Sequence, residues 1–162
     1  MCGCTGAIKS GCKSSCAKTT CASIIAQVEC LPNIYQGDDE TIIIQFFDQS
    51  CKALDISKYS FYAVIFDLLS TILATYSYPL DSTSDLEIKI LQELDTNGDF
   101  INKGKISIQL TSDLTSKMIT GPVSLEIKLI ENDDTFPNGI KTKRIGCLQI
   151  AEIKFSKINT IE

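Results

Sequence analysis

Apolar and polar residues alternate along most of the chain beyond Asn33, and this period of two constrains the fold more than any other feature. The clearest run covers residues 123–129, which read Val, Ser, Leu, Glu, Ile, Lys, Leu. Successive side chains of a β-strand point to opposite faces, so a segment with this pattern buries one face and leaves the other in water. The chain is therefore expected to fold mainly as half-buried strands.

Seven segments carry a strand pattern: 41–47, 59–67, 71–78, 86–90, 105–110, 123–129 and 143–155. The apolar phase changes within the last of them, and either a β-bulge near Ala151 or a strand that switches sheets would explain the change. The stretch 111–118 is expected to form one or two helical turns, with Thr111 or Ser112 as N-cap. About seven strands, short loops and one helical turn predict an all-β fold, an antiparallel β-sandwich of two sheets.

The segment 59–67 is apolar on both faces, which is typical of a central strand covered on its second side. The connection after it places large aliphatic side chains where a hairpin tip is usually polar: Leu68, Leu69, Ile72 and Leu73. These residues are expected to form a contact between copies of the chain, so the sequence predicts a homo-oligomer. The alternative is that the N-terminal arm folds back over the same surface.

Charge and hydropathy exclude several classes of protein. The net charge of −5 is unevenly distributed, because the first 30 residues are net positive and the remainder is acidic, so binding to nucleic acid is not expected. No stretch approaches the roughly 20 consecutive apolar residues of a membrane-spanning helix. No secretory signal is apparent, and the expected protein is soluble, does not bind a membrane and is made in the cytoplasm.

Six of the eight cysteines crowd the start of the chain: Cys2, Cys4, Cys12, Cys16, Cys21 and Cys30. Residues 1–28 are therefore expected to form a cysteine-rich arm, an anchor or assembly segment, and residues 29–162 the β-sandwich domain. Three interpretations of the arm stay open: a zinc site at Cys2, Cys4, Cys12 and Cys16, disulfides that also include Cys21 and Cys30, or reduced thiols packed in an assembly. Cys147 lies in a strand pattern and is expected to be a small buried hydrophobic residue.

No catalytic residues emerge from the sequence, and no enzymatic activity is expected. Histidine is absent, which removes the commonest general base and the Ser-His and Cys-His pairs. The acidic runs 38–40 and 133–134 fall where turns are expected. Residues 95–99 copy the first half of a calcium loop, but Phe100 and Ile106 occupy the positions of the required glycine and glutamate, so a plain turn is expected.

Four blocks follow one another in a recognisable order: Gln-Gly-Asp-Asp at 36–39, Ala-Leu-Asp-Ile-Ser at 53–57, a strand at 104–110 leading into the helical turn at 111–118, and Gly121 ahead of the strand at 123–129. This order resembles the N-terminal immunoglobulin-like domain of phage baseplate upper proteins. It also resembles related phage structural modules, such as the head-fibre or decoration proteins of a crAss-like phage. The resemblance implies an immunoglobulin-like fold and a particle-building role without catalytic residues.

The function expected from these features is that of a structural component of a tailed-phage virion: a head-fibre, capsid-decoration, or baseplate and tail-adaptor protein. Such a protein would dock on other virion proteins through its arm and oligomerise through its sandwich. One alternative is a carbohydrate- or receptor-binding module on a host-recognition fibre, although the chain has no Trp for a sugar platform. Another is a small cytoplasmic metal-binding protein that uses the N-terminal cysteines.

Overall fold

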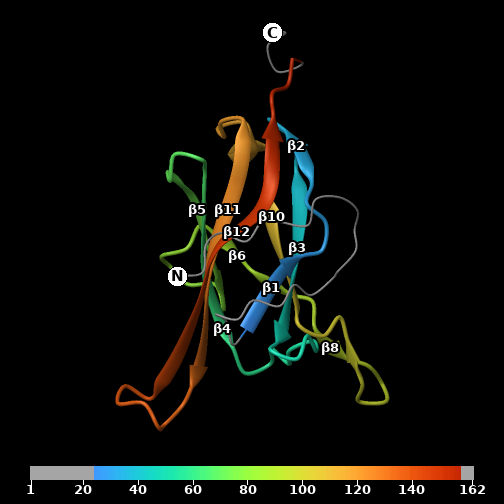
Figure 1. The fold of residues 1–162 in the computed structure, drawn as a ribbon, viewed down its shortest axis with the longest axis vertical. Helices are drawn as coiled ribbons and strands as arrows, with labels where there is room; N and C mark the ends of the chain where they lie inside the picture. The colour runs from blue at the N-terminus through green and yellow to red at the C-terminus, as the bar shows by residue number, and fades with distance from the viewer. Residues whose placement is uncertain (1–23, 158–162) are drawn as a thin grey trace.

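The computed structural model describes residues 24–157, and these residues form twelve strands and one short helix (Figure 1). In chain order they are β1 (Ile24–Val28), β2 (Asn33–Tyr35), β3 (Glu40–Asp48), β4 (Ser60–Phe66), β5 (Ile72–Tyr78), β6 (Leu86–Glu87), β7 (Lys89–Ile90), β8 (Glu93–Leu94), β9 (Phe100–Ile101), β10 (Lys105–Leu110), α1 (Ser112–Thr115), β11 (Gly121–Asn132) and β12 (Ile140–Lys154). The prediction of an all-β fold is confirmed.

The strands form two large sheets and a separate hairpin. The first sheet has the order β1-β3-β10-β7, the second has the order β2-β12-β11-β4-β5-β6, and β8 pairs with β9. Most neighbours are antiparallel, but β2 runs parallel to β12 and β6 runs parallel to β5. The hairpin of β11 and β12 extends well beyond the body at the lower left of Figure 1.

The expected number of about seven strands is not confirmed, since five of the twelve contain only two or three residues. The segment 86–90 shows why alternation miscounts them. It was expected to be one strand, but β6 pairs with β5 of the second sheet and β7 pairs with β10 of the first. Between them lies Ile88, which is buried in the shared core. One short alternating run therefore crosses from one sheet to the other.

The end of the expected arm is a strand of the first sheet. β1 pairs with β3 in antiparallel register, from Ile24 opposite Asp48 to Val28 opposite Ile44. Ile24 and Val28 belong to the hydrophobic core. Residues 1–23 and 158–162 lie outside the described residues, and so do five of the cysteines: Cys2, Cys4, Cys12, Cys16 and Cys21.

The core lies between the two sheets and is built from the inward faces of the predicted strands. On β3 the inward face carries Ile42, Ile44 and Phe46, which are all buried. The ring of Phe46 stacks on Phe61 of β4, with 5.6 Å between the ring centroids, and this contact joins the first sheet to the second. Aromatic pairs of this kind add to the free energy gained from burying their area.

A second contact between the sheets is polar. The hydroxyl of Tyr76, on β5, donates a hydrogen bond of 2.8 Å to the backbone carbonyl of Gln109, on β10. Burial raises the pKa of Tyr76, and the negative charge of Asp85 raises it further. The phenol therefore stays protonated and remains a donor across the physiological range.

Two local predictions are confirmed. Thr111 caps α1, since its hydroxyl accepts a hydrogen bond of 3.3 Å from the backbone N–H of Leu114. The pairing of β11 with β12 shifts at the predicted place, because Val123 lies opposite Ala151 whereas Ser124 lies opposite Gln149. The extra residue, Ile150, is buried beside Ala151, which accounts for the change of apolar phase along β12.

We expect Phe46→Ala to lower the free energy of unfolding by about 3–5 kcal/mol, because it removes a fully buried ring and leaves a cavity between the sheets. Leu69→Ala is the control, since this exposed side chain should change stability by no more than about 0.5 kcal/mol. Urea unfolding followed by circular dichroism measures both. Equal losses in the two variants would contradict the assignment of the core.

Candidate interaction surface

The hairpin tip between β4 and β5 has a fixed backbone. The carboxylate of Asp67 accepts hydrogen bonds from the backbone N–H groups of Leu69 and Thr71, at 2.9 and 3.0 Å. Ser70 has a positive φ of 63°, which closes the turn. Asp67 itself is buried, so the polar residue of this turn points inward and the aliphatic residues are left outside.

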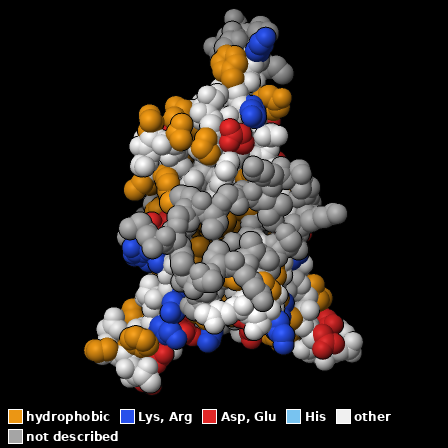
Figure 2. Space-filling model, viewed as in Figure 1, with side chains coloured by type: hydrophobic (Ala, Val, Ile, Leu, Met, Phe, Trp, Pro, Cys, Tyr) orange, Lys and Arg blue, Asp and Glu red, His pale blue; other side chains and the backbone are white. Residues whose placement is uncertain are grey.

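Large aliphatic side chains project from this tip, in the place where the sequence predicted a contact. Leu68 is 64% exposed, Leu69 74% and Ile72 64%, whereas Leu73 is half-buried. Leu68 also lies beside the start of β11, since a Cβ built on Gly121 would be 3.9 Å from its Cδ2 atom. Figure 2 shows apolar side chains gathered at the upper left of the molecule, where Figure 1 places this tip. We call Leu68, Leu69, Ile72 and Leu73 the aliphatic tip.

The aliphatic tip continues onto the outer face of β4. Tyr62, Val64 and Phe66 point away from the core and are half-buried, whereas the alternate residues of β4 are buried inside. They lie opposite Lys128, Glu126 and Ser124 of β11. The prediction that this strand is central in its sheet is confirmed. The expected cover of its second face is not, since that face stays partly open among the described residues.

Charged residues border this outer face. The Nζ atom of Lys128 lies 6.0 Å from the ring centroid of Tyr62. Nε of Arg144, on β12, forms an ion pair of 3.1 Å with Glu126, on β11. An apolar strip with a polar border is the composition found at protein contacts, where the core of the interface is apolar and the rim is wet.

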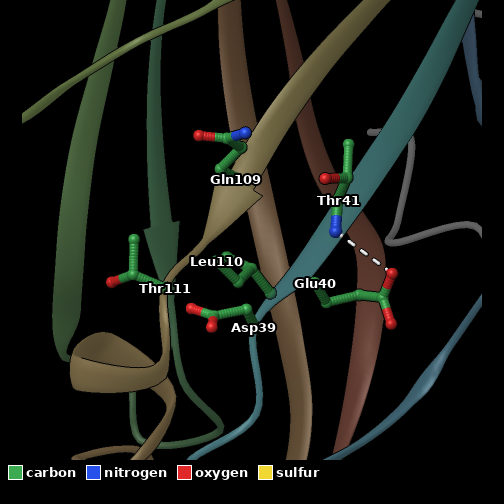
Figure 3. Close-up of a pocket in the computed structure, with 6 residues that line it drawn as sticks. All are labelled: Asp39, Glu40, Thr41, Gln109, Leu110 and Thr111. Atoms are coloured by element: carbon green, nitrogen blue, oxygen red, sulfur yellow. Dashed lines mark hydrogen bonds between the residues drawn. The ribbon is translucent and has the colours of Figure 1, made fainter.

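A polar pocket of about 300 Å³ opens where β3 begins and β10 ends (Figure 3). It is lined by Asp39, Glu40, Thr41, Gln109, Leu110 and Thr111. Asp39 accepts a hydrogen bond of 2.6 Å from the backbone N–H of Ser112, and Glu40 accepts one of 3.1 Å from that of Thr41. These carboxylates therefore bind the start of α1 and of β3.

The acidic turns are held by their own carboxylates. Asp95 accepts hydrogen bonds from the backbone N–H groups of Asn97 and Asp99, at 2.8 and 2.9 Å, and so forms the plain turn that the sequence predicts. Asp133 accepts from the hydroxyl and the backbone N–H of Thr135, and these bonds lower the pKa of Asp133. Both carboxylates are explained by turn geometry.

The cysteines require one correction. Cys147 was expected to be a buried hydrophobic residue, but it is half-buried, has a positive φ of 56° and is disulfide-bonded. Cys30 and Cys51 are disulfide-bonded as well. A strand pattern shows which way a side chain points but not whether a second cysteine lies next to it, so the sequence missed Cys51 and Cys147.

The expected zinc ligands Cys2, Cys4, Cys12 and Cys16 lie outside the described residues. Between residues 24 and 157, no group of three or more His, Cys, Asp or Glu residues is placed to hold a metal ion. No helix in this part of the chain is long and apolar enough to cross a membrane. Compared with known proteins, the chain matches no family model and none of the curated sequences.

Gln92 clamps the base of the β8–β9 hairpin to the loop before β4. Its amide oxygen accepts hydrogen bonds from the backbone N–H groups of Ile56 and Gly104, and its amide nitrogen donates one of 2.8 Å to Asp55. Asp55 also accepts from the backbone N–H and the hydroxyl of Ser57. The hydrogen bonds from Ser57, followed by that from Gln92, lower the pKa of Asp55.

This shift predicts a dependence of stability on pH. The folded pKa of Asp55 is below its unfolded value, which is about 3.9, so the ionised carboxylate adds to the free energy of unfolding above that value. This stabilisation is lost as the pH falls through the folded pKa. We expect Asp55→Asn to be less stable than wild type at pH 7 and the difference to shrink at low pH. Urea midpoints measured across this range test it, with the exposed Asp134→Asn as the charge control. A difference that stays constant at acid pH would refute the clamp.

Proposed function

We propose that this chain is a structural protein of a tailed-phage virion, an immunoglobulin-like module that acts as a head-fibre, capsid-decoration, or baseplate and tail-adaptor protein. In this proposal the N-terminal arm docks the protein on other virion proteins and the sandwich forms a homo-oligomer. The protein is made in the cytoplasm of the host bacterium and ends in the particle. It binds no nucleic acid and catalyses no reaction.

The strand order supports an immunoglobulin-like topology. In that fold the strands A, B, E and D form one sheet, and G, F and C form the other, with C′ added beyond C in variable-type domains. The order β1-β3-β10-β7 corresponds to A, B, E and D, and the order β12-β11-β4-β5 corresponds to G, F, C and C′. The seven strands A to G are then β1, β3, β4, β7, β10, β11 and β12, β5 is C′, and the short strands β2, β6, β8 and β9 are additions.

The inward residues of these strands also suit such a topology without the disulfide between strands B and F that antibody domains have. The inward residues of β3 and β11 are all apolar, and Phe46 stacks on Phe61 in the middle of the core. A sandwich with such an apolar core serves as a rigid frame that presents hairpins. This agrees with the resemblance to phage structural modules, in which the domain positions other parts.

The aliphatic tip is the observation that carries the proposal of a structural role. Three exposed aliphatic side chains on a backbone fixed by Asp67 form a surface suited to contact with another protein. The adjoining outer face of β4 extends this surface across the sheet. A second copy of the chain is the simplest partner, because a symmetric oligomer brings the same patch from both subunits together.

The alternative of a carbohydrate- or receptor-binding module has one observation in its favour. Tyr35 and Phe155 are both exposed, and they lie at the same end of the second sheet because Tyr35 pairs with Lys154. Exposed aromatic side chains can hold a sugar ring. Binding of the purified protein to a glycan array, lost in Tyr35→Ala, would favour this alternative over a purely structural role.

We expect mass spectrometry of purified particles from the source phage to find this chain as a component present in many copies. Intensities normalised to the major capsid protein give the copy number. Detection only in the lysate of infected cells, and never in purified particles, would refute the virion proposal.

We expect the double variant Leu68→Ser, Leu69→Ser to form a smaller species than wild type in light scattering, with unchanged β content, because neither side chain contributes to the core. Leu94→Ser, Ile101→Ser is the matched control, since it removes two exposed aliphatic side chains from the separate β8–β9 hairpin. A monomeric wild type, or an equal effect of both double variants, would refute the interface.

A further inference from the structure

The outer face of the second sheet carries an apolar strip that runs along the strands from one end to the other. The aliphatic tip forms one end, where Leu68 lies beside Gly121. The outward residues of β4 continue the strip, and Ile130 of β11 and Ile140 of β12 form its other end, towards the tip of the β11–β12 hairpin. Figure 1 shows the β4–β5 tip and the β11–β12 tip at opposite ends of this sheet.

The strand register places the outward residues of this face in rows across the sheet. On β4 and β11 they lie side by side in three pairs: Phe66 with Ser124, Val64 with Glu126, and Tyr62 with Lys128. On the far side of β11, Arg144 lies opposite Lys128. Successive rows are about 7 Å apart, because each spans two residues of strand.

These rows are balanced about Ile127, whose own side chain is buried in the core. Glu126 is one residue before it and Lys128 one residue after it, so the two charges lie on either side of the centre. Leu68 lies beside Gly121, six residues before Ile127, and Ile140 lies opposite Asn132, five residues after it. The face therefore has apolar ends at similar distances from a centre that separates opposite charges.

The charges near the centre are placed to meet another molecule. Glu126 forms an ion pair with Arg144 of its own chain, and the Glu126 side chain is still 38% exposed. Within residues 24–157, Lys128 forms no ion pair, and its Nζ atom lies 6.0 Å from the ring centroid of Tyr62. The cation of Lys128 can therefore bind a carboxylate that a second molecule brings to this face.

A second copy of the chain brings such a carboxylate to the required place. In a two-fold dimer whose axis crosses the strands at Ile127, the strands of the two copies run antiparallel, and each row before the centre meets the matching row after it. Glu126 of each copy then faces Lys128 of the other. If the strands of the two copies ran in the same direction, Glu126 would come level with Glu126 and Lys128 with Lys128, which brings like charges together.

We propose that the outer faces of the second sheets of two copies pack against each other with their strands antiparallel. Two Glu126–Lys128 pairs join the centre, and the aliphatic tip of each copy packs on Ile130 and Ile140 of the other. Stacked sheets lie about 10 Å apart, a distance that a Glu and a Lys side chain span together. This dimer rests on the homo-oligomer of the proposed function, because the same aliphatic tip supplies its ends.

Charge reversal tests the antiparallel arrangement. We expect Lys128→Glu and Glu126→Lys each to raise the dissociation constant of the dimer by at least about tenfold, because each substitution brings two like-charged pairs together. A 1:1 mixture of the two variants should dimerise as wild type does, since every facing pair in the mixed dimer is then opposite in charge. Lys89→Glu, at an exposed position on β7 of the first sheet, is the matched control and should dimerise normally.

Sedimentation velocity measures the dimer, and circular dichroism checks that each variant is folded. The double swap Lys128→Glu, Glu126→Lys restores both pairs within one sequence and should dimerise as wild type does, which keeps the test decisive if one single variant fails to fold. Single variants that dimerise as well as Lys89→Glu, or a mixture that stays monomeric, would overturn the antiparallel arrangement and leave the homo-oligomer standing. A monomeric wild type would overturn the homo-oligomer of the proposed function as well.

The apolar ends are tested separately. We expect Ile140→Ser to raise the dissociation constant by about tenfold, because it removes an aliphatic contact from both ends of the dimer. Ile101→Ser is the matched control, since Ile101 is 41% exposed and Ile140 37%, and Ile101 lies on the separate β8–β9 hairpin. Equal dissociation constants for the two variants would overturn the contact between the aliphatic tip and the β11–β12 hairpin.

Discussion

The structure depends on one constraint: two twisted sheets must bury their inner faces against each other, and neither has a stable fold without the other. The stacking of Phe46 on Phe61 meets this constraint at the centre, and the hydrogen bond from Tyr76 to Gln109 meets it nearer one edge. Because these contacts join the sheets, the strand order around them is fixed. The hairpins at the ends of the strands are then free to vary without loss of the core.

The surfaces that matter for function are a consequence of this arrangement. The Asp67 carboxylate points inward at the hairpin turn, so the aliphatic tip is presented outward on a rigid hairpin. The first sheet presents the opposite case, because its outer face is buried around Ile25 and Gln27. The second sheet is therefore the one that offers an open apolar surface to a partner.

Sequence periodicity predicted those elements in which one face of a long strand is buried. The alternation in 123–129 lies within β11, and the change of phase near Ala151 marks a true bulge. Alternation could not predict β6 and β7, because a run of five residues looks the same whether it stays in one sheet or crosses to the other at Ile88. β1 was missed because it is short and its outward residues are apolar or uncharged. The bonded state of Cys51 and Cys147 depends on which strands are neighbours, and that information is absent from residue spacing.

The central claim is that the two sheets share one core through Phe46 and Phe61, and nuclear Overhauser effects between aromatic side chains test it most directly. We predict strong effects between the ring protons of Phe46 and those of Phe61, whose centroids lie 5.6 Å apart, and further effects between Tyr76 and the end of β10. If Phe46 instead showed contacts only to residues of its own sheet, while the β3–β10 and β4–β11 ladders were intact, the two sheets would not pack as described and the account would be wrong.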